Sequence, residues 1–499
     1  ELKFADGLFE AEKLRAHLGE HELTIAVKPT DDGTRQHQIA IEGVVDIKQF
    51  LSPLPKVHDY LTGASHWQVA IDLSPTQGLR QPLFKLRASS RLESVLSRLP
   101  GPLAKSSTSA LPAKLQLSVM PDQKMQLELQ LADDRLLRLN ELNDDWAVDI
   151  AAPSIKGGAI ISKQSSLASS LAHPLAINLQ YLNLQQFINA GSAVNAPATV
   201  AQKPTAENQL TQNLQAIKPG DIPSVNLNVS QLVWGDYVFR DLLLNSTQTK
   251  NAMMIKALQL STDHYELSGE GSWQSSWSQQ HTTHLKTQIK LHNLGEALKV
   301  LDIYEDIEKT QGIVDLDLRW NDKPYAFSWI QLYGSGRLAL KDGVLSKINA
   351  GPARMLGLFN LKTVLSLDFA SQLSEGFAFD QAGGSFSISK GNIYSDNLSI
   401  ESKVADILLR GRLDMQQKTV DQTIRVRPHV SSSVAFGTTV VAGPAAGGLV
   451  YLLQKMFTPD RLSEYEYRVT GNLQKPQVTL LSVPEAQEAE SGTGAAGEF

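Results

Sequence analysis

The sequence contains no cysteine, which excludes disulfide bonds and thiolate metal sites and leaves the redox state of its compartment open. It has no block of basic residues either, and 46 basic against 52 acidic side chains give a net charge of -6. A nucleic-acid partner is therefore not expected. Phosphate loops, dinucleotide fingerprints and nucleophile elbows of the usual pattern are missing as well. No cofactor is indicated.

Charge is absent from residues 431–454, a stretch of 24 positions. A helix needs about 20 apolar residues to cross a bilayer, but glycines and Pro444 interrupt this stretch. We therefore expect a pair of short apolar helices over residues 431–457 that lies at a membrane interface or re-enters it. A helix buried in an ordinary protein core is the alternative interpretation.

The two ends of the sequence carry little fold information. No initiating methionine, signal peptide or apolar anchor precedes the first strand-like residues, so we expect a fragment of a longer protein. Residues 482–499 are rich in Glu, Ala, Gly and Ser, a composition typical of a disordered tail.

Most of the remaining sequence alternates apolar and polar residues, which predicts β-strands with one apolar and one solvated face. The short spacing between these segments disfavours helical crossovers. We predict a mainly β fold with an elongated, curved sheet of antiparallel type and a few short helices. The clearest strands contain residues 23–27, 67–71, 115–119, 125–131, 225–229 and 314–320.

Helical spacing of apolar residues predicts short helices at residues 90–99, 293–304 and 353–365. Residues 191–220 are rich in Ala, Asn, Gln, Thr and Pro and read as a flexible linker or insertion. The predicted organisation is two β segments at residues 1–190 and 221–430 on either side of this linker, then the apolar segment 431–457, terminal strands at 458–481 and the tail.

Two small constellations qualify as catalytic or metal-binding candidates. His281 and His284 have the spacing of two helical metal ligands, but polar residues typical of a turn surround them. Asp315 and Asp317 share one face of a predicted strand, as a carboxylate pair would, and Arg319 shares it too, which favours a surface ion network. Neither identifies an enzyme, and no catalytic or metal residue is predicted.

The C-terminal third resembles the YhdP proteins, AsmA-like relatives of TamB. The resemblance rests on Gly-Pro-Ala-Arg-Met-Leu-Gly-Leu-Phe-Asn at 351–360 and on the blocks at 367–369, 376–380, 420–422 and 467–476. It covers residues 312–480, and more loosely 4–27 and 67–73. The chain departs from it at residues 363–367, where such proteins often carry paired arginines.

The resemblance implies a periplasmic bridge, anchored in the inner membrane by an N-terminal helix and reaching the outer membrane at its C-terminal end. It implies a sheet that forms an open groove, a β-taco, with an apolar floor for phospholipids. The predicted lining residues, which in the alternative interpretation fill a closed β core, are Val314, Leu316, Leu318, Leu338, Leu340, Phe386, Ile388, Leu409, Leu413, Ile424 and Val426.

At the end of such a groove the apolar segment would contact a bilayer, or fold back and plug the groove. Two other functions stay open on the residues alone: a structural tether or regulator of outer-membrane assembly that carries no lipid, and an envelope enzyme that uses Asp315 and Asp317. The residues predicted to contact acyl chains are Phe436, Val440, Val441, Leu449, Val450, Leu452 and Leu453.

Overall fold

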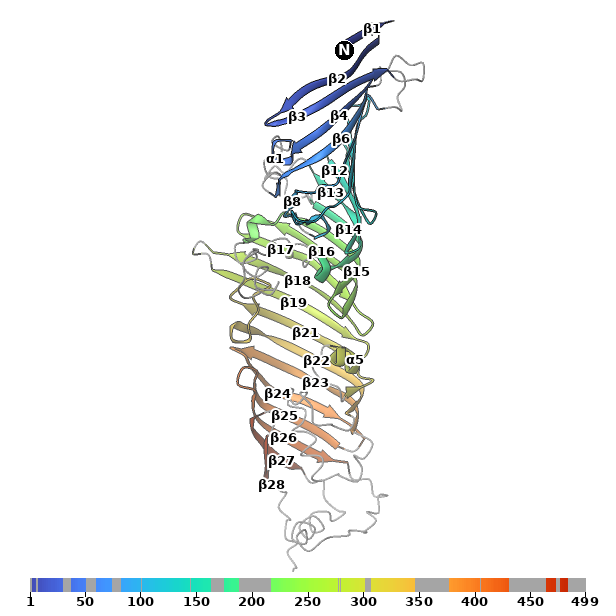
Figure 1. Ribbon diagram of the computed structural model, residues 1–499. Helices are drawn as coiled ribbons and strands as arrows, with labels where there is room; N and C mark the ends of the chain where they lie inside the picture. The colour runs from blue at the N-terminus through green and yellow to red at the C-terminus, as the bar shows by residue number, and fades with distance from the viewer. Residues whose placement is uncertain are drawn as a thin grey trace, which may run out of the picture. The chain divides into compact units, whose positions relative to one another are not determined.

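A computed structural model describes most of the β-rich part of the chain. The described residues are 2–5, 8–29, 37–50, 60–73, 82–99, 101–143, 145–162, 175–187, 217–276, 278, 280–300, 307–345, 377–403, 405–429, 464–472 and 476–482. The chain divides into two compact units, Glu1–Thr262 (unit 1) and Asp263–Phe499 (unit 2). Each is built around strands that lie side by side (Figure 1).

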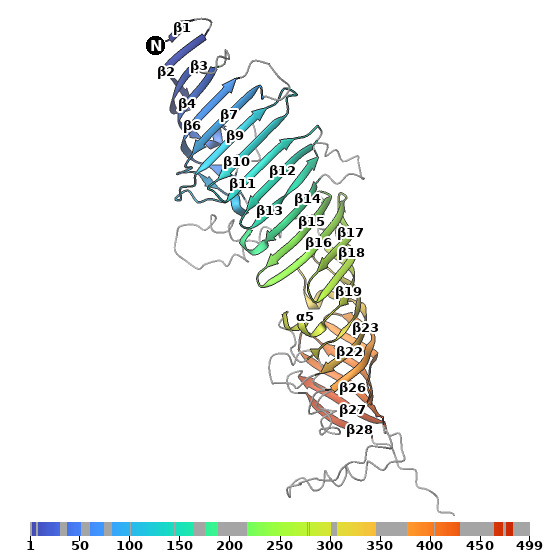
Figure 2. The same ribbon diagram turned by 90° about the vertical axis from the view of Figure 1, so that its right-hand side faces the viewer.

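Unit 1 is a sheet in which consecutive strands pair with each other almost throughout. Its strands are β1 (Leu2–Ala5), β2 (Leu8–Leu18), β3 (His21–Pro29), β4 (His37–Asp46), β6 (Ala64–Leu73), β7 (Phe84–Ser90), β9 (Ala113–Val119), β10 (Met125–Leu131), β11 (Arg135–Glu141), β12 (Asp145–Ala152), β13 (Ile155–Ser162), β14 (Leu175–Asn183), β15 (Val225–Trp234), β16 (Tyr237–Gln248) and β17 (Ala252–Ser261). Two short strands, β5 (Leu61–Thr62) and β8 (Leu96–Ser97), pair separately. Figure 2 shows the strands from β2 to β16 following one another in this order.

Unit 2 repeats the same arrangement. Its strands are β18 (Tyr265–Ser275), β19 (His281–Leu291), β20 (Ile307–Glu308), β21 (Gln311–Trp320), β22 (Leu332–Leu345), β23 (Phe377–Ser389), β24 (Asn392–Glu401), β25 (Ala405–Asp414), β26 (Thr419–Pro428), β27 (Tyr465–Asn472) and β28 (Gln477–Ser482). Neighbours in the chain pair antiparallel, except that β19 pairs with β21, while the short β20 pairs with the far end of β22. The mainly β prediction is confirmed, and each of the six strands named from the sequence is present.

The antiparallel prediction needs one correction, because β14 and β15 pair in parallel. Parallel neighbours need a long crossover between them. Residues 184–224 connect them and include the whole predicted linker, most of which lies outside the described residues. The sheet is thus continuous across the predicted linker, while the chain divides into its two compact units between Thr262 and Asp263. The predicted domain boundaries themselves stay predictions.

The helices are few and short, as predicted. Among the described residues they include α1 (Ile47–Phe50), α5 (Leu294–Val300) and the 3-10 turns η1 (Gly101–Leu103), η2 (Pro219–Asp221) and η3 (Trp329–Gln331), and residues 184–187 are helical as well. The helix predicted at residues 293–304 is present as α5, where the Asn293 side chain accepts a hydrogen bond from the Glu296 amide. The helix predicted at residues 353–365 lies outside the described residues. None of the described helices is long and apolar enough to span a bilayer.

The helix predicted at residues 90–99 is wrong. The Ser90 hydroxyl accepts a hydrogen bond from the Leu92 amide, and Leu92 has a left-handed φ of 46°, so the chain turns there instead of coiling. Residues 96–97 then form β8. The apolar spacing does reflect burial, because Leu92 and Val95 are both buried. These residues belong to an irregular connection that packs on the sheet, not to a helix.

Candidate functional site

The apolar face of unit 1 is continuous from strand to strand. Residues directly opposite each other in paired strands point to the same side of a sheet, so the register identifies rows of side chains. One such row is apolar at every strand from β2 to β17: Ala11, Val27, Ile39, Ile71, Leu86, Leu117, Leu127, Leu139, Val148, Ala159, Ile177, Leu227, Leu244 and Leu258.

A second row lies beside the first on the same face. It contains Ile25, Ile41, Val69, Ala88, Leu115, Leu129, Leu137, Ile150, Gly157, Leu179, Val229 and Leu242. Most members of both rows are half-buried and keep part of their surface accessible. We call these two rows the apolar face of unit 1.

One connection of unit 1 folds over the strand ends of this face. Residues 91–112 place Leu92 and Val95 on Ala113 and Leu131, and Lys105 fixes the connection by donating hydrogen bonds to the carbonyls of Val95 and Ser106 at 2.9 and 2.8 Å. Burial lowers the pKa of the Lys105 ammonium. The outer surface of the connection is polar and charged, as expected for an ordinary cover.

The opposite face of unit 1 is polar. Arg87 pairs with Asp72 at 2.8 Å and Arg138 with Glu128 at 2.8 Å across neighbouring strands. A hollow of about 740 Å³ opens on this side of β3 to β10. Its lining combines both signs of charge with glutamines and alanines, and it also reaches Ile41, Val69 and Leu115 of the second row.

In unit 2 all eleven predicted lining residues lie on one face. The register aligns Val314 with Leu338, Leu316 with Gly336 and Phe386, Leu318 with Gly334 and Ile388, and Ile388 in turn with Ile393 and Leu413. Further rows join Leu340 to Val426 through Ala382, Ile400 and Ile407, and Leu409 to Ile424. The register thus shows that these residues share a face, and their role as a lipid-binding lining stays a prediction.

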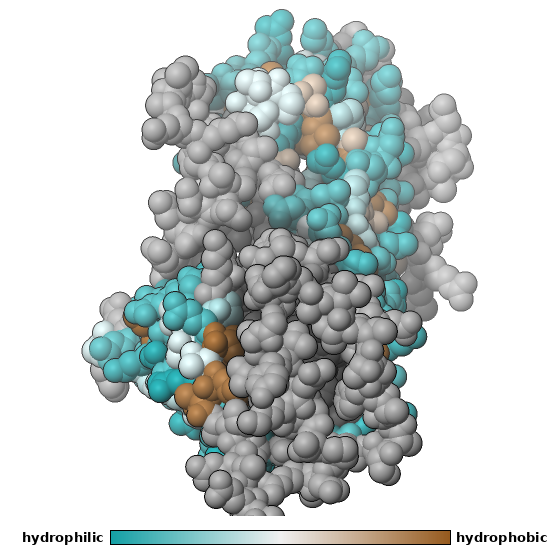
Figure 3. Space-filling model, turned by 90° about the horizontal axis from the view of Figure 1, so that it is seen from below, coloured by the Kyte–Doolittle hydropathy of each residue, from teal (hydrophilic) through white to brown (hydrophobic). Residues whose placement is uncertain are grey.

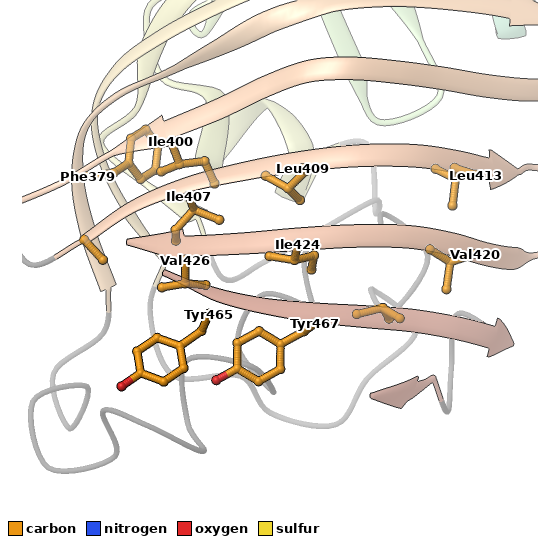
Figure 4. Packing of buried hydrophobic residues seen from close by; sticks show 12 residues of the cluster. Phe379, Ile400, Ile407, Leu409, Leu413, Val420, Ile424, Val426, Tyr465 and Tyr467 are labelled. Carbon is orange, nitrogen blue, oxygen red and sulfur yellow. The ribbon is translucent and has the colours of Figure 1, made fainter. Parts of the chain in front are cut away.

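Burial on this face increases toward the C-terminal strands. Val314, Leu316, Leu318, Leu338, Leu340 and Phe386 are half-buried, whereas Ile388, Leu409, Leu413, Ile424 and Val426 are buried. The buried group belongs largely to one cluster on β23 to β27, whose side chains lie in rows across neighbouring strands (Figure 4). The face of unit 2 therefore combines accessible residues on β21 to β23 with a closed cluster on β23 to β27.

Sequence reasoning missed several members of this cluster. Val420, Ile400, Ile407, Tyr465, Tyr467 and Val469 are all buried in it. Their alternation with polar residues was visible in the sequence, and only the pairing partners were not. The face also contains polar positions, among them Gln422, whose side-chain oxygen is buried without a hydrogen-bond partner among the described residues.

Phenylalanine rings lie over two glycines of unit 2. A Cβ atom at Gly336 would clash with the Phe386 ring, and one at Gly343 would clash with the Phe379 ring. Each glycine is directly opposite its phenylalanine in the β22–β23 pair. A glycine on a strand leaves backbone uncovered, and the cross-strand ring covers it here with apolar surface.

The candidate catalytic residues belong to ordinary cross-strand contacts. His284 lies on strand β19, with Nε2 2.7 Å from the Asp317 carboxylate, and the Gln288 amide donates to Asp315 at 2.8 Å. His281 accepts a hydrogen bond from the Trp273 indole. The spacing predicted for helical metal ligands therefore does not apply to this strand, and within the described ranges no group of three potential metal ligands gathers.

The residues predicted to contact a membrane, Phe436 to Leu453, lie outside the described residues. Viewed along the direction of Figure 3, the described surface is mostly hydrophilic with small hydrophobic areas.

A family model and a curated protein both match the chain. The model of the family described as YhdP protein matches residues 1–143 and 132–478. Among curated proteins, the "Intermembrane phospholipid transporter YhdP" of Escherichia coli (strain K12) is 25% identical over 238 residues, which is 46% of this chain and 19% of that protein. The match thus spans about a fifth of the relative's length. No solved structure matches the chain.

Proposed function

Since the chain belongs to the YhdP family, we propose that it conducts phospholipids between the inner and outer membranes of a Gram-negative envelope. The lipid tails would travel along the apolar faces of its sheets. The matched relative is named an intermembrane phospholipid transporter, which supports this proposal. The observation that carries it is the unbroken apolar row from Ala11 to Leu258 in unit 1, together with the accessible apolar residues of β21 to β23.

The physical need for such a surface is large. Each methylene exposed to water costs about 0.8 kcal/mol, so exposing about 25 methylenes of two acyl chains costs roughly 20 kcal/mol. A barrier of that size limits escape into water to roughly one event in a hundred seconds. A face that replaces water along the whole path removes most of the barrier, and the headgroup can stay in solvent.

The dimensions of unit 1 suit a path longer than one lipid. Paired strands lie about 4.8 Å apart, so the row from β2 to β17 is about 60 Å long. One leaflet of a bilayer contributes about 15 Å of hydrocarbon. The row is therefore long enough for several lipids in succession, as continuous conduction requires.

Conduction breaks no covalent bond, so the proposal needs no catalytic residue. On the polar face of unit 2, Asp317 has structural partners in His284 and Lys286. We propose a non-enzymatic role in which this face keeps the sheet soluble while the other carries lipid.

The cellular setting follows from the same proposal. We place the chain in the periplasm, as part of a longer protein that an N-terminal helix anchors in the inner membrane. Residues 431–457 would contact the outer membrane, or plug the path until a partner releases them. A protein that only tethers the envelope and carries no lipid is the alternative.

Site-specific crosslinking tests the proposal. A photoreactive amino acid at Leu316 or Leu340 should crosslink to phospholipid in cells, because both residues are half-buried on the apolar face of unit 2. The same probe at Asp315 or Lys341, the exposed chain neighbours on the other face, is the matched control and should give no lipid adduct. Equal labelling at both pairs, or none at either, would favour the tether.

A further inference from the structure

The connection between β21 and β22 exposes an unusual concentration of aromatic side chains. Four of the eighteen large hydrophobic residues exposed by the described part of the chain lie within residues 325–330. They are Tyr325, Phe327, Trp329 and Ile330, exposed by 43, 47, 40 and 51%. We call these four residues the aromatic rim. Contiguous exposed apolar surface of this kind costs free energy and usually marks an interaction site.

The aromatic rim is held in place by the last row of the apolar face of unit 2. That row contains Trp273, Thr283, Trp320 and Leu332, all buried. Tyr325 packs edge-on against Trp273 at 6.2 Å, and Phe327 packs edge-on against Trp320 at 5.9 Å and Trp329 at 5.4 Å. The rings therefore pack both on the apolar face and on each other.

Hydrogen bonds fix the backbone of the same connection. The Trp320 indole donates to the Lys323 carbonyl at 2.9 Å, and the Thr283 hydroxyl donates to the Asp322 carbonyl at 2.7 Å. Tight turns follow at Ala326 and Gln331, whose amides donate to the Lys323 and Ser328 carbonyls. The aromatic side chains are thus presented outward by an ordered connection.

The equivalent cover in unit 1 provides an internal comparison. Residues 91–112 also fold over the strand ends of an apolar face, but they turn Leu92 and Val95 inward and expose charged side chains such as Arg91 and Glu93. Covering a strand-end row therefore does not require outward aromatic residues. The aromatic rim of unit 2 needs another explanation.

We propose that the aromatic rim is a lateral entry point, where phospholipid from a membrane surface passes onto the apolar face of unit 2. This inference rests on the proposed lipid conduction. The aromatic rim contains tryptophan and tyrosine, which favour the boundary between hydrocarbon and headgroups. It is also continuous with Trp320, Leu332 and Ile388, which pack against Leu318 and Phe386 of the predicted path.

Uptake kinetics test the entry point. The chain is mixed with vesicles of phosphatidylethanolamine and phosphatidylglycerol that carry a self-quenched fluorescent phospholipid, and lipid uptake is followed by dequenching. The double variant Phe327→Ser/Trp329→Ser should lower the initial rate about tenfold, as expected for loss of two aromatic anchors. The amount of lipid bound at equilibrium should stay unchanged, because the apolar face itself is intact.

The matched control is Trp234→Ser/Val238→Ser at the turn between β15 and β16, where the two side chains are 54 and 44% exposed. This control variant should take up phospholipid at the same initial rate as the wild-type chain. Ile330→Ser guards against misfolding of the double variant, since Ile330 is half exposed; it should slow uptake about threefold with an unchanged melting temperature.

The outcomes separate the two proposals. Normal uptake by both rim variants would overturn the entry point and leave lipid conduction standing. Equal slowing by the Trp234→Ser/Val238→Ser control would also overturn it, because any exposed apolar pair would then have the same effect. Failure of the wild-type chain to take up lipid at all would remove conduction itself and the entry point with it.

Discussion

Phospholipid transfer between donor and acceptor vesicles is expected to slow about tenfold or more when Leu338 is replaced by aspartate. Leu338 is half-buried on the apolar face of unit 2, opposite Val314 and Gly384. An ionised carboxylate on this face must keep its water, and a passing acyl chain would have to displace that water. A penalty of only about 1.4 kcal/mol at one point of the path suffices for a tenfold effect.

The adjacent residue provides a matched control. Ala339 lies on the same strand but points to the polar face, where it is exposed and opposite Ile313. Ala339→Asp introduces the same side chain and the same charge into β22 and should leave transfer within about twofold of wild type. Normal transfer by a folded Leu338→Asp variant would contradict conduction along this face, and so would equal loss in both variants.

The second large effect concerns stability. Ile424→Ala should lower the free energy of unfolding by about 3 kcal/mol, because Ile424 is fully buried among Leu409 and Tyr467 and the change leaves a cavity. Leu316→Ala should cost under about 1 kcal/mol, because Leu316 is half-buried and loses less buried surface. Urea denaturation followed by circular dichroism measures both.

The difference between these two costs reports on the architecture of the face. A large cost at Ile424 and a small one at Leu316 correspond to a closed cluster on β23 to β27 and accessible residues on β21 to β23. Should Leu316→Ala cost as much as Ile424→Ala, the β21 to β23 part would also be a sealed core. An acyl chain would then find no accessible apolar surface there.

The strands were predictable because alternation with period two is a local property of the sequence. It assigned Leu316, Leu338 and Phe386 to apolar faces without any knowledge of their neighbours. Register was not predictable, since alternation determines which face a residue occupies but not its partner. The rows that join Ala11 to Leu258, and Leu340 to Val426, therefore emerged only from the structure.

The misassigned and missed features share a cause. Leu92, Val95 and Leu96 have helical spacing, yet the Ser90 hydroxyl turns the chain and the connection packs on Ala113. The spacing correctly predicted that apolar residues of this segment are buried, but it wrongly predicted a helix. The aromatic rim could not be recognised in the sequence, because its residues follow neither the helical nor the strand periodicity of apolar positions. Only its packing on Trp273 and Trp320 shows its relation to the apolar face.

The most direct test of the central claim is mass spectrometry of lipids extracted from the purified chain after gentle isolation without detergent. Conduction along an apolar face predicts co-purified phospholipids, with more than one per chain because the row in unit 1 alone is about 60 Å long. A folded chain that carries no phospholipid, and takes up none from vesicles, would contradict the account.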